Sequence, residues 1–332
     1  MKPSSYLELP DAADASEQDS QVPLPEGARR VAVIDLGSNS LRLLVSQVGG
    51  DGRIQVLNCV KSMVRLGEGA FENQALQPQA IERTVSVLKT FARTCRSYGV
   101  SKVVAVATAS VREAENGKEF TERVKAETGI DFSVISGPEE ARLITKGVEA
   151  SLPRADYPRA YMDIGGGSTE VVAFADGKIT DAVSLEFGSL SMYKTYVSRL
   201  FPKNSEERAI RKKVENEIKK VKFLKKKQFA DMVGIGGTIR AVKKFNNDRF
   251  GLPKENDRIL MDQMHLLLED LQEEEKLTLN KILRVAPDRV HTMVPGMIIL
   301  DTLCDYFSCE EIRMSNFGVR EGYLYKKVVM GK

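Results

Sequence analysis

The sequence contains few of the residues that build several common kinds of site. It has no tryptophan, and its only histidines are His265 and His291. Neither has a histidine or cysteine partner at metal-ligand spacing, so a zinc site is not predicted and His265 reads as an ordinary helix residue. Four cysteines occur without CxxC spacing and without a preceding signal peptide: Cys59, Cys95, Cys304 and Cys309. They predict reduced thiols in a cytoplasmic protein.

Long apolar runs and a strong net charge are also lacking. A membrane-spanning helix needs roughly 18–20 apolar residues, and the longest candidate, 293–303, is interrupted by Pro295 and Asp301. The formal net charge is only +3, which argues against a nucleic-acid coat protein or a membrane-surface protein. Of the 332 residues, 42% are hydrophobic and 29% are charged. This is the composition of a globular protein long enough for two domains.

The chain contains a repeated segment. A tail at 1–28 is acidic, rich in Ser and Pro, and expected to be disordered. Two apolar runs at 31–35 and 41–48 then flank a short turn. The same order of strand, turn and strand recurs at 160–164 and 170–175, and the related segment VGIGGT at 233–238 leads into a basic helical stretch. Internal similarity of this sort indicates duplication.

Between and after the two copies, helical and strand patterns alternate, which predicts an α/β protein. The predicted helices lie at 78–98, 116–128, 138–150, 206–228, 261–272, 277–283, 294–307 and from 320 onward. Further strands are predicted at 102–107, 132–135, 179–185 and 311–314. The dipeptides Gly137-Pro138 and Leu152-Pro153 interrupt the chain near 136–158, so we expect one domain at 29–150 and another at 151–332. The helix at about 318–332 is expected to pack back on the first domain.

The two turns carry the strongest chemical signal. Each follows a strand that ends in an aspartate, Asp35 or Asp163, and combines glycine with hydroxyl side chains. Glycine lets the backbone approach a ligand closely so that successive amides bind an anion, and a carboxylate is a hard oxygen ligand for Mg²⁺. A single turn of this kind would more often only connect two strands, but two copies favour phosphate binding. The predicted phosphate-binding residues are Gly37, Ser38, Asn39, Ser40, Gly165, Gly166, Gly167, Ser168 and Thr169, with Arg42 beside the first turn.

Three charged residues are further candidates. Glu140 follows Glu139 in the first turn of a predicted helix, where the helix dipole alone favours acids, but a carboxylate there can also be a general base that activates water. Glu170 follows the second turn and would act on a metal or on the water, unless it is an outward-facing strand residue. Arg112 follows a buried strand and can bind phosphate through two hydrogen bonds. Its alternative is a surface ion pair with a neighbouring glutamate.

One segment, 203–227, is strongly basic. Most such runs are solvated helix faces, and this is the favoured interpretation here. A polyanionic substrate would nevertheless need a basic track with salt-sensitive affinity. Only Phe223 accompanies the lysines, with Phe229 just beyond them, so sequence-specific nucleic-acid binding is not expected. The candidate track residues are Lys219, Lys220, Lys225, Lys226 and Lys227.

The two turns resemble the phosphate segments of the actin, Hsp70 and sugar-kinase superfamily. Seven motifs carry a finer resemblance, which extends from about residue 30 to the end of the chain. They are DLGSNSLRLLV at 35–45, ATASVREAENGKEF at 107–120, ISGPEEARLITKGV at 135–148, DIGGGSTEVV at 163–172, EFGSLSMYK at 186–194, VGIGGT at 233–238 and SNFGVREGYLY at 315–325. Together these motifs resemble the exopolyphosphatase and guanosine pentaphosphate phosphohydrolase family in its short two-domain form.

This resemblance implies two duplicated ribonuclease-H-like domains with an interdomain cleft. It also implies a Mg²⁺-dependent phosphatase in which Glu140 activates water, Glu170 is a second catalytic carboxylate and Arg112 positions phosphate. The implied metal ligands are Asp163, Glu170 and Asp35, the last at the equivalent place in the first domain.

The expected activity is removal of terminal phosphate from inorganic polyphosphate, with guanosine pentaphosphate (pppGpp) as a further substrate. Two alternatives stay open: an ATP-using kinase or ATPase of the same superfamily, and a non-enzymatic alarmone sensor. The segment Gly234–Thr238 would recognise a nucleotide base or only close the domain core. We also expect a homodimer, because two basic helices could extend one polyanion groove.

Overall fold

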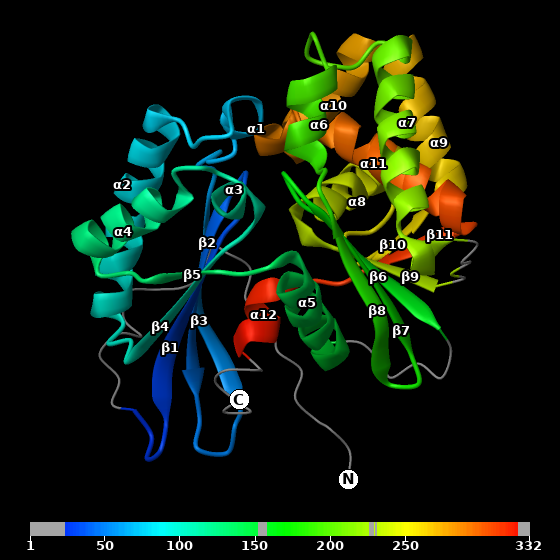
Figure 1. Ribbon diagram of the computed structural model, residues 1–332. Helices are drawn as coiled ribbons and strands as arrows, with labels where there is room; N and C mark the ends of the chain where they lie inside the picture. The colour runs from blue at the N-terminus through cyan, green and yellow to red at the C-terminus, as the bar shows by residue number, and fades with distance from the viewer. Residues whose placement is uncertain (1–23, 152–157, 226–228, 230, 325–332) are drawn as a thin grey trace. The chain divides into compact units, whose positions relative to one another are not determined.

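The structure is a computed structural model that describes residues 24–151, 158–225, 229 and 231–324. The predicted tail up to residue 23 and the last predicted helix beyond residue 324 lie outside these ranges. The chain divides into two compact units, Met1–Ser136 with Val319–Lys332 and Gly137–Gly318. Each unit is built around one mixed sheet with helices against it (Figure 1). The predicted α/β class is therefore confirmed.

The sheet of the first unit has five strands in the order β3-β2-β1-β4-β5. Their bounds are β1 Arg29–Leu36, β2 Leu41–Val48, β3 Ile54–Ser62, β4 Lys102–Ala107 and β5 Phe132–Val134. β1 lies at the centre, antiparallel to β2 and parallel to β4. Its residues from Val31 to Ile34 are at most 1% exposed. A strand that is buried on both faces reads as a continuous apolar run, which is why its position was predictable.

Helices cover both faces of this sheet. They are α1 Ala70–Asn73, α2 Pro78–Ser97, α3 Ala109–Arg112, α4 Gly117–Thr128 and α12 Val319–Leu324. α2 begins at Pro78, a residue suited to the first helical position, and its Leu88 and Phe91 share an apolar cluster with Ile34. α4 packs beside α2, and α12 packs on β1 from the opposite face (Figure 1).

The second unit repeats this topology. Its six strands lie in the order β10-β11-β9-β6-β7-β8. The bounds are β6 Arg159–Ile164, β7 Thr169–Ala175, β8 Lys178–Leu185, β9 Asp231–Ile235, β10 Arg258–Leu260 and β11 Glu311–Met314. Read from β8, the first five strands match β3-β2-β1-β4-β5 in order and direction. β10 adds one antiparallel edge strand.

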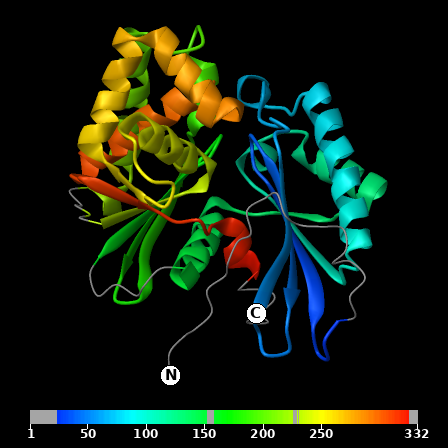
Figure 2. The ribbon, with the colours of Figure 1, turned by 180° about the vertical axis from the view of Figure 1, so that it is seen from behind.

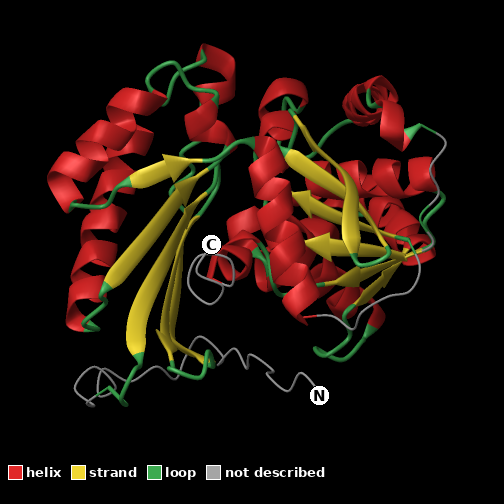
Figure 3. Cartoon of the chain, turned by 60° about the horizontal axis from the view of Figure 1, so that its bottom comes forward, coloured by secondary structure: helices red, strands yellow, loops and turns green. Residues whose placement is uncertain are grey.

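Seven α-helices of the second unit lie within the described residues. They are α5 Gly137–Ser151, α6 Ser189–Tyr196, α7 Asn204–Lys220, α8 Gly236–Phe250, α9 Met261–Glu273, α10 Glu275–Val285 and α11 Met293–Phe307, with short 3₁₀ turns at Lys222–Leu224 and Pro287–Arg289. α5 packs on β7 and β8. The other helices lie on the other face of the sheet (Figures 2 and 3). They share one apolar cluster with Met162 and Ile164, and α11 is buried among them.

Several elements differ from the expectations. The sequence analysis did not predict five short or partly polar elements, because their patterns are weak: β3, β10, α1, α3 and α6. The basic helix ends at Lys220, where Val221 adopts an extended backbone, rather than continuing to residue 228. The two units divide before α5, whereas the sequence placed the boundary after it, because α5 packs on strands of the second sheet. Among the described residues, no helix combines the length and apolar character that crossing a membrane requires.

Gly147 provides a test of how α5 is seated. A Cβ added there would lie 2.4 Å from the backbone oxygen of Gly318. In an exposed helix, replacing glycine with alanine stabilises by about 1 kcal/mol. We expect Gly147→Ala to destabilise by about 1–3 kcal/mol instead, because backbone cannot yield as a side chain does. Thermal melting measures the change, and Lys146→Ala at the neighbouring exposed position is the control. A raised melting temperature for Gly147→Ala would contradict this packing.

Candidate active site

The two glycine turns have the same geometry. In the first, the Gly37 amide donates to the Ser40 carbonyl at 3.1 Å, and in the second the Gly165 amide donates to the Ser168 carbonyl at 2.9 Å. The flanking strands pair in the same register. Asp35 and Asp163 therefore occupy equivalent places, each one residue before the end of the strand that precedes its turn.

In the second unit, this register lines up three side chains across the sheet. Asp163 on β6 is opposite Glu170 on β7, which is opposite Ser184 on β8. Residues directly opposite in antiparallel strands have Cβ atoms about 5 Å apart. The Ser184 hydroxyl donates to Glu170 Oε1 at 2.7 Å, and Glu170 is 1% exposed. The interpretation of Glu170 as an outward-facing strand residue is thus excluded by its burial.

The first residue of α5, Gly137, lies against Ser184, the last side chain of this row. A Cβ added to Gly137 would fall 2.3 Å from Ser184 Cβ, so the helix begins in direct contact with β8. Glu140, in the first turn, is 7% exposed, whereas Glu139 is half-buried. The structure thereby gathers Glu140, Glu170 and Asp163 on the sheet face that α5 covers.

The first residue of α8, Gly236, lies against the carboxylate of Asp163. Gly236 has φ +87°, and a Cβ added to it would lie 2.0 Å from Asp163 Oδ1. Only glycine allows this approach and this backbone conformation at low cost. The positive end of a helix macrodipole stabilises a nearby carboxylate. The segment Gly234–Thr238, whose role the sequence left open, therefore holds Asp163 in place.

α6 fixes the second turn and was missed by the sequence analysis. Its Ser189 amide donates to the Gly165 carbonyl, and the Leu190 amide donates to the Gly166 carbonyl, both at 2.9 Å. A Cβ on Gly188 would be 2.6 Å from the Gly166 carbonyl carbon. The sequence signal for this helix was the Gly188-Ser189 pair at its start. Ser191 Oγ accepts a hydrogen bond from the Gly188 amide at 2.9 Å.

In the first unit, the turn is held by the segment after β3. The Gly67 amide donates to the Ser38 carbonyl at 2.8 Å, and the Arg65 amide donates to the Asn39 carbonyl at 3.0 Å. Two buried polar atoms, Asn39 Nδ2 and Ser110 Oγ, have no hydrogen-bond partner among the described residues. Buried polar groups are nearly always paired. Both residues follow the carboxyl ends of neighbouring parallel strands, β1 and β4, which makes that edge suited to a ligand.

Basic residues surround this edge. Arg112 Nη1 donates to the Ile135 carbonyl at 3.0 Å, while Nη2 lies 3.5 Å from Glu113 Oε1. The ion pair that was the alternative to phosphate binding is thus present but long. Arg42 lies opposite Asp35 in the register and opposite Lys61 on its other side.

The candidate polyanion track is tied into its own helix. Lys219 pairs with Glu215, and Lys220 pairs with Glu217, both at 2.8 Å. Both lysines and Lys225 are exposed, while Lys226 and Lys227 lie outside the described residues. These pairs agree with a solvated helix face, the interpretation that the sequence favoured.

Comparison with known proteins identifies the family. The family model described as "Ppx/GppA phosphatase family" matches residues 44–330. The chain belongs to this family. A protein of Haemophilus influenzae named "Putative exopolyphosphatase" is 31% identical over 300 residues, covering 90% of this chain and 91% of its own length.

Solved structures agree. The Ppx/GppA family member of Aquifex aeolicus has a TM-score of 0.74 at 29% identity, covering 92% of this chain and 99% of its own. An exopolyphosphatase of Cytophaga hutchinsonii has a TM-score of 0.81 at 25% identity, covering 91% and 98%. The predicted family is confirmed, and membership favours a phosphoanhydride hydrolase over the kinase and sensor alternatives.

The contact between Gly236 and Asp163 can be tested with a matched pair of variants. Gly251 also has a positive φ, +63°, but an added Cβ would meet nothing within 4 Å. Gly236→Ala and Gly251→Ala should each lose about 1 kcal/mol from the left-handed backbone. We expect only Gly236→Ala to lose phosphatase activity, because it also displaces the Asp163 carboxylate. Melting temperature and phosphate release are measured on both; equal activity in the two would rule out a role for this contact.

Proposed function

We propose that this protein is an exopolyphosphatase that hydrolyses the terminal phosphoanhydride bond of inorganic polyphosphate with the help of Mg²⁺. The observation that carries the proposal is the row of Asp163 and Glu170 on the sheet face covered by α5, with the buried Glu140 in the first turn of that helix. pppGpp presents the same kind of bond and is proposed as a further substrate.

The carboxylates fit a magnesium ion. Mg²⁺ prefers oxygen ligands and is bound by one or two carboxylates together with substrate phosphates and water. Asp163 and Glu170 supply such a pair on adjacent strands, and Ser184 and Gly236 hold each of them in place. When bound, Mg²⁺ would neutralise charge on the phosphate oxygens.

Glu140 is proposed as the general base. A water molecule attacks the terminal phosphorus while Glu140 accepts a proton from it. The bond between the terminal phosphorus and the bridging oxygen breaks, and the shortened polyphosphate leaves with that electron pair. The amides of the 165–169 turn are proposed to hold the terminal phosphate oxygens during this step.

The first unit is proposed to bind phosphate groups. The unpaired donors Asn39 Nδ2 and Ser110 Oγ support this role, as do Arg112 and Arg42 near the same strand ends. Arginine recognises phosphate geometry well. We propose that Asp35 orients Arg42, which it faces across the strand pair, and thus serves the phosphate rather than the metal. A cytoplasmic location and a homodimer stay predictions.

Glu140→Gln tests the base. The substitution keeps the shape of the side chain and removes its ability to accept a proton. We expect phosphate release from polyphosphate to fall by about 10²-fold or more, while polyphosphate binding is retained. Glu139→Gln, one position away and half-buried, is the control and should stay active. Normal turnover in Glu140→Gln would remove it from the role of base. Parallel assays with pppGpp and ATP, all with Mg²⁺, distinguish the phosphatase from a kinase or a sensor.

Asp163→Asn and Arg42→Ala should separate metal binding from substrate binding. We expect Asp163→Asn to raise the Mg²⁺ concentration needed for half-maximal activity by about tenfold or more. Arg42→Ala should instead raise KM for polyphosphate and weaken its dependence on salt, because one phosphate contact is lost. Phosphate release is measured over series of Mg²⁺, substrate and salt concentrations. The assignment fails if the two variants show the same pattern.

A further inference from the structure

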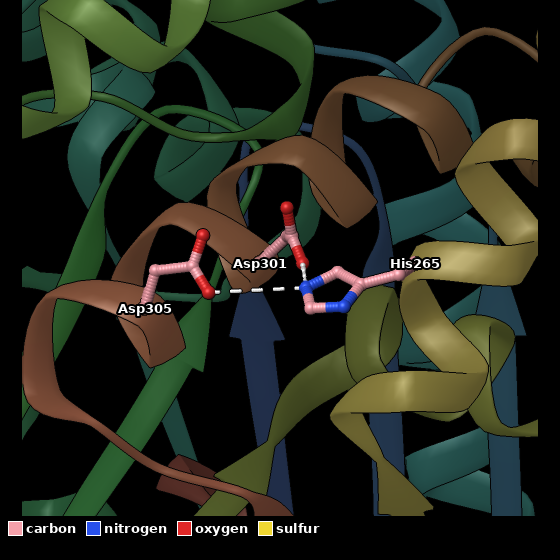
Figure 4. Close-up of side chains that lie close together, drawn as sticks. All are labelled: His265, Asp301 and Asp305. Carbon is pink, nitrogen blue, oxygen red and sulfur yellow. Dashed lines mark ion pairs between the residues drawn. The ribbon is translucent and has the colours of Figure 1, made fainter.

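A second cluster of potential ligands lies in the second unit, on α9 and α11. His265 on α9 is brought together with Asp301 and Asp305 on α11 (Figure 4). The aspartates are four residues apart and so share one helix face. His265 Nε2 lies 3.1 Å from Asp301 Oδ1 and 3.8 Å from Asp305 Oδ1. Both carboxylates thus face the same ring nitrogen.

Asp301 is the unusual member of the cluster. It is 1% exposed, and its Oδ1 receives no hydrogen bond within the described part of the chain. A neutral imidazole nitrogen that carries no proton is an acceptor, as is a carboxylate oxygen. Two acceptors 3.1 Å apart therefore need a cation between them, either a proton on His265 or a metal ion.

The other oxygen of Asp301 is already used. Arg211 Nη1 donates to Asp301 Oδ2 at 2.6 Å and lies 3.3 Å from Thr302 Oγ1. This fixes the carboxylate plane and leaves Oδ1 directed at His265. Partners that orient a ligand in this way are typical of metal sites in proteins. Burial at 1% exposure removes most of the hydration of the Asp301 carboxylate, so a cation beside Oδ1 offsets the cost of burying its charge.

The spacing also suits a small divalent cation. With tetrahedral zinc bonds of about 2.0–2.2 Å to nitrogen and oxygen, neighbouring ligand atoms lie roughly 3.3–3.6 Å apart. His265 Nε2 and Asp301 Oδ1 lie 3.1 Å apart, so a small outward shift of the exposed imidazole brings them to this spacing. Asp305 is 60% exposed, and the ligand atoms of all three residues lie within 4.8 Å of one another. His265 is 46% exposed, which leaves an open side for a water ligand.

We propose that His265, Asp301 and Asp305 form a zinc-class divalent metal site that clamps α9 to α11. Imidazole together with carboxylates suits Zn²⁺, whereas Mg²⁺ prefers oxygen alone. Zinc bound there joins the two helices across the helical layer of this unit. The inference is independent of the proposed phosphatase, because none of the three residues belongs to the row at 163, 170 and 184 or to the first turn of α5.

Direct titration tests the site. Protein without an affinity tag is stripped with a chelator, dialysed and titrated with ZnCl₂ by calorimetry. Wild type should bind one zinc ion that His265→Gln and Asp305→Asn each weaken by tenfold or more. Glu269→Gln is the matched control, since Glu269 is an exposed acid one turn from His265 on α9. It should bind as wild type does.

A second readout separates metal binding from a simple ion pair. Zinc should raise the melting temperature of wild type and Glu269→Gln but not of Asp305→Asn, whose exposed side chain can be changed without loss of folding. Co²⁺ in place of Zn²⁺ should give a visible absorption band that is lost in His265→Gln. Absence of zinc binding by wild type, or unchanged binding in both ligand variants, would overturn the proposal.

Discussion

β6 and β7 pair in a register that places Asp163 opposite Glu170, and the rest of the candidate site is built against that pair. Side chains of a strand alternate between faces, so a slip of β7 by one residue relative to β6 would turn Glu170 away from Asp163 and toward the apolar cluster around Met162 and Ile164. The short turn after β6 prevents such a slip. Ser184 then holds Glu170 from the next strand.

Burying two carboxylates side by side is unfavourable unless fixed dipoles or cations offset their charge. Three helices begin against this row or the turn beside it, and each does so through a glycine. Gly137 at the start of α5 touches Ser184, Gly188 just before α6 touches the turn, and Gly236 at the start of α8 touches Asp163. Helix N-termini carry partial positive charge, so their convergence lowers the cost of holding negative charge there. Each glycine is required because a side chain would occupy the space through which the helix approaches.

The sequence predicted those parts whose signal is local. The apolar runs of β1 and β6 read as buried strands, and α2 and α5 as amphipathic helices. α6 was not predictable, because its polar sequence from Ser189 onward forms a helix only where the Gly165 and Gly166 carbonyls accept its first amides. β3 alternates polar and apolar residues weakly because it is an edge strand. The meeting of His265 with Asp301 was also beyond prediction, since its cause is the packing of α9 on α11 rather than any spacing along the chain.

The two units share a topology but differ in the charge of one row of side chains. Across the three antiparallel strands, the second unit carries Asp163, Glu170 and Ser184, whereas the first carries Asp35, Arg42 and Lys61. The aspartate is retained at the same place beside the same turn, so the backbone geometry does not account for the difference. Reversing the sign of the second position converts a place that attracts a cation into one that attracts an anion. Under the proposed function, substitutions at two strand positions thus suffice to give one unit a row suited to a metal ion and the other a row suited to phosphate, while the glycine turn stays unchanged.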